Sequence, residues 1–334
     1  TLVHAGGSVS PLIESRRIRA SVAQYLPGAG RFYRQYLPLF PSIIEWFDLD
    51  DHDLVISTSH CAAKAVVPTG RAIHVCYCHS PMRYAWDQFD AYFGADRLGA
   101  APRALLRHVM AGLARWDRAT APRVDRFLAN SRYVAGRIAR YYNRRASVLY
   151  PPVDTAFFTP DGTRPEPYFL VVSALVPYKR IDLAIAAANR LGVPLKIVGS
   201  GPEEARLREA AGPTVTFAGT IDPAALRDAY RRAQAVLLPG EEDFGIVPVE
   251  AMACGRPVVA LGRGGARETI LPGVTGQLVE DATPDAFAAA MDDTRRHAWE
   301  AARIRAHAER FGVERFESAL RETLTDALAA ASGC

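Results

Sequence analysis

The chain of 334 residues is longer than one ordinary hydrophobic core, so two domains are expected. Apolar residues make up 49% and charged residues 23%, which excludes a disordered chain, and no apolar run approaches the roughly 20 residues of a membrane span. The net charge of +4 is uneven: residues 1–157 carry 20 Lys and Arg against 12 Asp and Glu, and the remainder carries 20 against 24. The basic first half indicates anionic partners such as phosphates or lipid head groups.

Neither the N-terminal stretch nor the cysteines indicate a secretion signal or a metal site. The N-terminal stretch has no charged start followed by an apolar run, so no signal peptide is predicted and a cytoplasmic protein is expected. The five cysteines lack the paired spacing of a zinc site. We therefore expect buried free thiols and no bound metal at Cys61, Cys76, Cys78, Cys254 and Cys334.

The first half is an irregular α/β pattern. Strands are predicted at 53–58, 73–79, 126–131 and 147–153. A long helix is predicted over 101–119, because Leu105, Leu106, Val109, Met110, Leu113 and Trp116 form one apolar stripe. The Pro-rich segment 150–168 is typical of a linker between domains.

The second half alternates short apolar strands with helices. The strands are expected at 168–175, 195–199, 215–219, 235–239 and 258–261, and 313–331 is helical again. Such βα units build an open parallel sheet with helices on both faces, and ligands bind beyond the carboxyl ends of its strands. We therefore predict two Rossmann-like domains, 1–157 and 158–312, that face each other across a cleft, with helix 313–331 as a candidate to pack back on the first domain.

The segment 239–260 carries the most chemical information. Glu242 lies in a loop after a strand, and Glu250 follows within a short helix that Gly255 and Pro257 terminate. A helix N-terminus suits an anionic diphosphate, and carboxylates accept hydrogen bonds from sugar and ribose hydroxyls. For two isolated glutamates, a solvated loop charge and a charge near the helix start are the simpler alternatives.

The complete segment resembles the E-x₇-E signature of glycosyltransferase family 4, here Glu242, DFGIVPV and Glu250, followed by A-x-x-x-G-x-P-V. The resemblance extends over nearly the entire chain. It includes LVVSALVPYKRIDLAIAA, IVGSGPEEARL, RGGARETI, FLANSRYV and VLYPPVDTAFF, and HVCYCHSPMRYAWD is similar to the branch of bacterial O-antigen and exopolysaccharide mannosyltransferases. It implies the GT-B fold and a hexosyltransferase that uses a nucleotide diphosphate sugar.

The resemblance also assigns roles. It implies that Glu242 contacts the sugar hydroxyls of the donor, that Glu250 binds the ribose, and that Lys179 neutralises the departing diphosphate. The remaining donor-binding residues that it implies are Arg180, Gly199, Gly201, Phe244, Gly245 and Ile246. The family often has an Arg where this chain has Ala174, and Arg180 is our substitute for that charge.

Two histidines follow strands of the first half. The resemblance makes His79 the active-site histidine that contacts the donor sugar from the N-terminal domain, although a histidine at a strand end is by itself more often structural. His60 follows the preceding strand in the same way. It is a candidate to face the acceptor.

Two further patterns have simpler explanations. Asp48-Leu49-Asp50 and Asp51-His52-Asp53 match the D-x-D metal motif of the other glycosyltransferase fold, but they precede a strand, so turn chemistry is the preferred interpretation. Gly264-Gly265 with Glu268 suits phosphates, and it suits a helix start with a capping acid equally well.

The family resemblance implies a retaining, metal-independent transfer with no cofactor, and GDP-mannose is the donor that it favours. The acceptor is expected to be a glycan or lipid-linked sugar, and no nucleic acid is expected. Family members open with a strand, a Gly-rich loop and a helix, and this first βα unit is expected to be missing here. The alternatives are a nucleotide-sugar epimerase of the same fold and a truncated protein that binds the donor without turnover.

The basic half raises a hypothesis about location. Arginines flank the 101–119 stripe, and the segment 31–47 is rich in aromatic and aliphatic residues. One interpretation is a peripheral enzyme that docks on the anionic inner face of the plasma membrane. The preferred alternative is that both apolar stripes pack into the N-terminal domain and that the arginines form a solvated rim.

Overall fold

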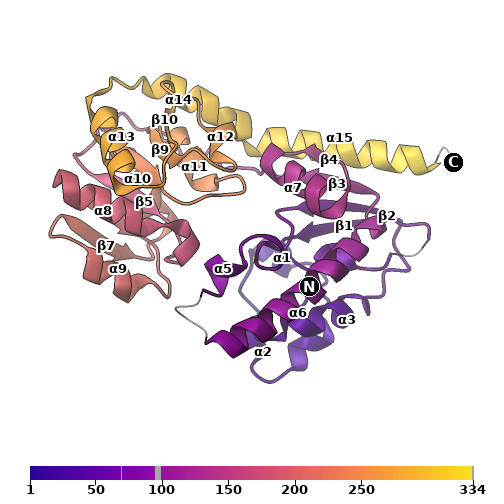
Figure 1. Cartoon of the computed structure of the whole chain (residues 1–334). Helices are drawn as coiled ribbons and strands as arrows, with labels where there is room; N and C mark the ends of the chain where they lie inside the picture. The colour runs from indigo at the N-terminus through magenta and orange to yellow at the C-terminus, as the bar shows by residue number, and fades with distance from the viewer. Residues whose placement is uncertain (69, 95–98, 333–334) are drawn as a thin grey trace. The chain divides into compact units, whose positions relative to one another are not determined.

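The computed structural model describes residues 1–68, 70–94 and 99–332, and its contacts divide the chain into two units (Figure 1). Unit 1 contains Thr1–Asn130, Val134–Val148 and the residues from Glu322 onward, and unit 2 contains Ser131–Tyr133 and Leu149–Arg321.

Unit 1 is built on a parallel sheet whose described strands lie in the order β1-β2-β3-β4. The strands are β1 (Leu54–Ser59), β2 (Ile73–Cys78), β3 (Arg126–Ala129) and β4 (Ala146–Val148). All four predicted strands are present, but the fourth ends earlier than expected. Pro151 and Pro152 explain this, because proline has no N–H to donate to a neighbouring strand.

The other described elements of this part of the chain are helical, and most of them are short. They are α1 (Pro11–Glu14), η1 (Val22–Tyr25), α2 (Ala29–Phe32), η2 (Tyr33–Leu39), α3 (Phe40–Ile44), η3 (Ala63–Ala65), α4 (Arg83–Trp86), α5 (Phe89–Tyr92), α6 (Ala100–Ala119), η4 (Ala121–Arg123) and α7 (Arg132–Tyr142).

The helix predicted over 101–119 is confirmed as α6, and most of its apolar stripe packs inside unit 1. Met110 and Leu113 are buried against Phe89, and Leu106 and Val109 pack beside them. Leu105 is the exception to the predicted stripe, since its side chain is 67% exposed. The interpretation that this stripe packs into the N-terminal domain therefore holds, apart from Leu105.

Unit 2 contains a parallel sheet with the described order β10-β9-β8-β5-β6-β7. The strands are β5 (Phe169–Val172), β6 (Leu195–Val198), β7 (Val215–Gly219), β8 (Ala235–Leu238), β9 (Val258–Leu261) and β10 (Gly276–Val279). The five predicted strands are confirmed. Strand β10 was not predicted, because its sequence GQLV is short and half polar, as an edge strand can be.

Both faces of this sheet are buried at β5, β6, β8 and β9, which explains the continuous apolar runs of these strands. Alternate side chains such as Phe169 and Val171 pack with α8 (Ile181–Leu191) and α13 (Pro284–Arg296). Their neighbours Leu170 and Val236 pack in a second core with α11 (Ile246–Ala253). The other helices of unit 2 are η5 (Pro177–Lys179), α9 (Glu204–Ala210), α10 (Pro223–Arg232), α12 (Ala266–Thr269), α14 (Ala301–Ala308) and η6 (Glu309–Phe311).

The Pro-rich segment 150–168, which we predicted as a linker between domains, follows the last strand of unit 1 and belongs to unit 2. Val153 and Phe158 are buried in the core of unit 2, and the Val153 N–H donates to the carbonyl oxygen of Phe311 at 2.9 Å. The prolines prevent regular structure without preventing burial, because apolar side chains between them still leave water.

The C-terminal helix α15 (Val313–Ser332) contributes to both units, and the boundary between them falls after Arg321. Of the predicted buried thiols, Cys76, Cys78 and Cys254 are buried, Cys61 is only partly buried, and Cys334 lies outside the described residues. None of the described helices has the length and apolar character needed to cross a membrane.

Candidate functional site

Strand order places one candidate site at the carboxyl ends of β5 and β8. These two strands are neighbours, and the chain runs away from them in opposite directions, to β6 and β7 on one side and to β9 and β10 on the other. Such a switch point separates the loops after the two strands and creates room for a ligand. The loop after β5 carries Lys179, and the loop after β8 carries Glu242.

The structure brings these two predicted residues together. The Lys179 ammonium group forms an ion pair with the Glu242 carboxylate, and their side chains are 20% and 13% exposed. Gly240 permits this approach of the two loops, because a Cβ there would lie 2.7 Å from the Tyr178 carbonyl oxygen. The two charges compensate each other here, and an incoming phosphate or hydroxyl would compete for each of them.

Arg180 is held by its own segment. Its guanidinium group is paired with Asp182 at 3.2 Å, and its backbone has a left-handed φ of +49°. A non-glycine residue in that region is strained, which is common where backbone is shaped around a ligand. The Asp182 carboxylate thus competes with the donor for the positive charge of Arg180.

Gly199 and Gly201 have a packing reason to be glycine. A Cβ on Gly199, whose φ is +123°, would lie 1.9 Å from the Ser173 carbonyl oxygen, and one on Gly201 would lie 2.4 Å from that of Leu175. The loops after β5 and β6 therefore pack backbone against backbone. Sequence reasoning attributed these glycines to close approach of the nucleotide, and it missed this contact.

The N-terminus of α11 begins at the same edge. Gly245 adopts a left-handed φ of +89° at the N-cap, and no side chain caps the helix start. Phe244 is buried against the rings of Tyr150 and Phe311, at centroid distances of 5.7 and 5.5 Å, whereas Ile246 is 46% exposed. The first amides of the helix, with its positive end, are suited to an anion.

Glu250 lies further along α11 in a mostly buried position. Its carboxylate accepts a 2.7 Å hydrogen bond from the hydroxyl of Tyr230, whose side chain is fully buried. Burial raises the pKa of Glu250 above its usual range, and the bond from Tyr230 opposes that shift. A carboxylate that is buried from water is a strong acceptor for further hydroxyl donors.

Gly264 and Gly265 hold the Glu242 loop from the side of β9. The Gly265 N–H donates to the Glu242 carbonyl oxygen at 2.8 Å, and a Cβ on Gly264 would lie 2.1 Å from that oxygen. Glu268 does not cap its own helix α12. It accepts from the Arg132 and Tyr133 amides, both at 2.8 Å, which corrects the capping-acid interpretation.

The two predicted histidines lie in unit 1. The His79 N–H donates to the Ser59 carbonyl oxygen at 2.8 Å, and its ring lies edge-on to Tyr77. Burial, with a smaller contribution from His60, lowers the pKa of His79, so its imidazole is neutral at neutral pH. His60 itself is exposed.

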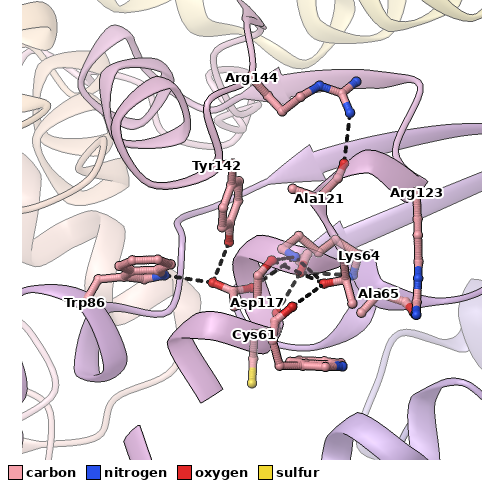
Figure 2. Close-up of polar contacts among 12 residues, drawn as sticks. Cys61, Lys64, Ala65, Trp86, Asp117, Ala121, Arg123, Tyr142 and Arg144 are labelled. Atoms are coloured by element: carbon pink, nitrogen blue, oxygen red, sulfur yellow. Dashed lines mark hydrogen bonds and ion pairs between the residues drawn. The ribbon is translucent and has the colours of Figure 1, made fainter. Parts of the chain in front are cut away.

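A buried polar cluster fixes the segments that follow both histidines. The Asp117 cluster consists of Lys64, Trp86, Asp117, Thr120 and Tyr142. Figure 2 shows Trp86 and Tyr142 meeting at the Asp117 carboxylate. Lys64 lies 3.0 Å from this carboxylate, which also accepts from the Trp86 indole and the Tyr142 hydroxyl at 2.8 and 2.9 Å. Lys64 follows His60 on η3, and Trp86 follows His79 on α4. Sequence reasoning did not detect this cluster, because its members are distant in the chain.

The D-x-D patterns fit turn chemistry. The Asp48 carboxylate accepts the Asp50 N–H at 3.2 Å, and both residues belong to the turn before β1. Within residues 1–68, 70–94 and 99–332, no group of three or more His, Cys, Asp or Glu side chains is arranged to hold a metal ion.

Comparison with known families covers both units. The profile described as Glycosyltransferase Family 4 matches residues 1–157, and the profile described as Glycosyl transferases group 1 matches residues 166–296. The chain belongs to glycosyltransferase family 4.

Curated relatives of this family-4 chain include a D-inositol 3-phosphate glycosyltransferase of Geodermatophilus obscurus. It is 33% identical over 245 residues, which cover 62% of this chain and 54% of the relative. A GDP-mannose-dependent alpha-(1-6)-phosphatidylinositol monomannoside mannosyltransferase of Mycolicibacterium smegmatis is 35% identical over 194 residues, covering 49% and 51%. The chain spans about half the length of the curated relatives it matches.

Solved structures identify the fold of the family-4 chain. Sucrose-phosphate synthase from Thermosynechococcus elongatus has a TM-score of 0.68 at 22% identity and covers 94% of this chain and 83% of its own. HepE of Anabaena, in complex with UDP-glucose, has a TM-score of 0.60 at 22% identity and covers 77% and 73%. The predicted GT-B fold class is thereby confirmed.

Proposed function

We propose that this family-4 chain is a retaining, metal-independent hexosyltransferase that uses a nucleotide diphosphate sugar. The observation that carries the proposal is the convergence of Lys179, Glu242 and the N-terminus of α11 at the switch point of one parallel sheet. A compact cation, a carboxylate and free helix amides are the groups that a sugar diphosphate needs.

The proposed chemistry assigns the charges in order. The donor diphosphate takes Lys179 from Glu242 and extends toward the first amides of α11. Glu242, released from the ammonium group, accepts hydrogen bonds from the sugar hydroxyls, and Glu250 accepts them from the ribose. The anomeric carbon–phosphate oxygen bond breaks while the acceptor oxygen bonds to the same face, and the acceptor proton passes to the leaving phosphate. Lys179 and the helix dipole stabilise the charge that develops on that phosphate.

The donor and the acceptor are finer parts of the proposal. One relative is named as GDP-mannose-dependent and acts on a phosphatidylinositol mannoside, and HepE was crystallised with UDP-glucose. We propose GDP-mannose as the donor and a glycan or lipid-linked acceptor in bacterial polysaccharide or glycolipid synthesis, with His79 as the active-site histidine of the N-terminal domain and His60 facing the acceptor.

The test compares binding and transfer. Lys179→Ala should weaken binding of the nucleoside diphosphate by at least about 10-fold while leaving the nucleoside alone within about 2-fold, because the ammonium group contacts only the phosphates. Lys196→Ala is the matched control, since Lys196 lies in β6 and its ammonium group is 6.0 Å from the centre of the Tyr168 ring. Calorimetry that shows equal losses for nucleoside and nucleoside diphosphate would contradict the assignment.

Transfer then separates the proposed enzyme from its alternatives. Glu242→Gln should lower transfer by at least about 10²-fold with the fold retained by circular dichroism. Donor turnover to an epimer without added acceptor would favour the epimerase alternative. Tight donor binding with no turnover in any acceptor mixture would favour an inactive donor-binding protein.

A further inference from the structure

Glu268 occupies the N-terminus of a helix to which it does not belong. Its two carboxylate oxygens accept from the Arg132 and Tyr133 amides at 2.8 Å each, and a third bond comes from the Tyr150 hydroxyl at 3.1 Å. These amides start α7, where the helix dipole favours a negative charge. Both bonds are charge-assisted, so this carboxylate holds the first turn of α7 firmly.

Tyr133 continues the connection toward the site. Its backbone amide is held by Glu268, and its hydroxyl donates to the carboxylate of Glu241, the neighbour of Glu242. We name the contacts among Glu268, Tyr133 and Glu241 the α7 clamp. One residue of α7 thus touches both the helix that follows β9 and the loop that follows β8.

The other side of the connection runs through α12. Gly265, at the N-cap of α12, donates its amide to the Glu242 carbonyl oxygen, and Gly264 forms a parallel bridge with Glu242. The contacts therefore close a ring from Glu242 to Gly265, along α12 to Glu268, across to Tyr133 and back to Glu241. A shift of the first turn of α7 has to move the Glu242 loop or break a bond in this ring.

The first turn of α7 has a special place in the chain. Ser131–Tyr133 belong to unit 2, whereas α7 from Val134 onward belongs to unit 1. The α7 clamp therefore holds a three-residue stretch of unit 2 that continues directly into unit 1 along the chain.

We propose that Glu268 and Tyr133 are positioning residues that couple α7 to the loop for the donor sugar. The α7 clamp holds Glu242 in the position in which it accepts the sugar hydroxyls, and the phosphate contacts of Lys179 do not depend on it. This inference rests on the proposed function, since it assigns the sugar to the Glu242 loop. A purely structural cap would instead affect the binding of every ligand, or only stability.

Two substitutions break the α7 clamp at different bonds. Glu268→Gln keeps the size of the side chain but presents an NH₂ group to one of the two amides, so one bond becomes a repulsive contact. Tyr133→Phe removes the bond to Glu241 and keeps the ring. Tyr150→Phe is the matched control. It removes a bond to the Glu268 carboxylate, but this bond joins Glu268 neither to α7 nor to the Glu242 loop.

Calorimetry provides the main readout, with GDP and UDP compared with GDP-mannose and UDP-glucose. Glu268→Gln and Tyr133→Phe should each weaken binding of the sugar nucleotide by at least about 10-fold relative to wild type while the nucleoside diphosphate stays within about 2-fold. Tyr150→Phe should leave both ligands within about 2-fold. Equal weakening of both ligands, or no weakening in either substituted protein, would overturn the coupling.

Hydrogen exchange provides a readout without any donor. Tyr133→Phe should accelerate exchange of the Gly265 amide, which lies on the opposite side of the ring from the altered hydroxyl. Unchanged exchange at Gly265 would refute the ring even if no sugar nucleotide bound. Failure of the wild-type protein to bind any of the four nucleotides would refute the proposed function and leave this exchange test standing.

Discussion

Replacement of Lys64 by methionine tests how unit 1 tolerates the loss of one buried charge. Lys64 and Asp117 are both 0% exposed, and the ammonium group contacts the Asp117 carboxylate at 3.0 Å and the Thr120 hydroxyl at 2.9 Å (Figure 2). Methionine has a similar volume and removes the charge. The Asp117 carboxylate then stays buried with only its hydrogen bonds from Trp86 and Tyr142.

The expected cost follows from this burial. Removal of one partner from a buried ion pair costs about 3–5 kcal/mol, because the remaining charge is neither solvated nor paired. For a unit of this size each kcal/mol lowers the melting temperature by roughly 2–4 °C, so Lys64→Met should melt about 10 °C earlier. The double variant with Asp117→Asn should lose less than Lys64→Met, since the neutral amide oxygen still accepts from Trp86 and Tyr142.

Urea unfolding of both variants, followed by circular dichroism and tryptophan fluorescence, gives the free energies. Lys196→Met serves as the control, because Lys196 is only partly buried and should change stability by less than about 0.5 kcal/mol. The reasoning is refuted if Lys64→Met costs less than about 1 kcal/mol, or if the double variant is less stable than Lys64→Met.

Three further outcomes are expected. Burial raises the pKa of Glu250, so the charge of this carboxylate opposes folding above the raised pKa and has no effect below the unfolded value of about 4.3. In a calorimetric series, Glu250→Gln should therefore have a higher melting temperature than wild type at pH 8 and the same melting temperature at pH 4. Gly199→Ala should lower the free energy of unfolding by about 3 kcal/mol, because its Cβ would lie 1.9 Å from a carbonyl oxygen. Gly192→Ala, with φ of +63° and open space around it, should lower it by about 1 kcal/mol, as measured by urea unfolding. If the basic half contacts anionic lipid, Arg115→Glu with Arg118→Glu should abolish salt-sensitive co-sedimentation with anionic vesicles; unchanged co-sedimentation would exclude these two exposed residues as the contact.

Local patterns in the sequence determined the elements and the fold class. The apolar runs around Phe169 and Val236 predicted strands buried on both faces, and the stripe that contains Met110 and Leu113 predicted α6. The complete segment from Glu242 to Glu250, together with further segments along the chain, resembled the family. These features depend on residues that are close in the chain, so periodicity and motif reveal them. Strand β10 was not predicted, because its four residues GQLV include only two apolar side chains.

Only the tertiary structure decided which of these residues meet. Lys179 and Glu242 are separated by 63 residues and are joined because β5 and β8 are neighbours in the sheet. Glu268 resembled a local cap in the sequence, yet it holds amides 135 and 136 residues away. The prolines of 150–168 suggested a linker, although Val153 is buried. Strand order and core packing determine which residues far apart in the chain come into contact, and no local sequence pattern predicts this.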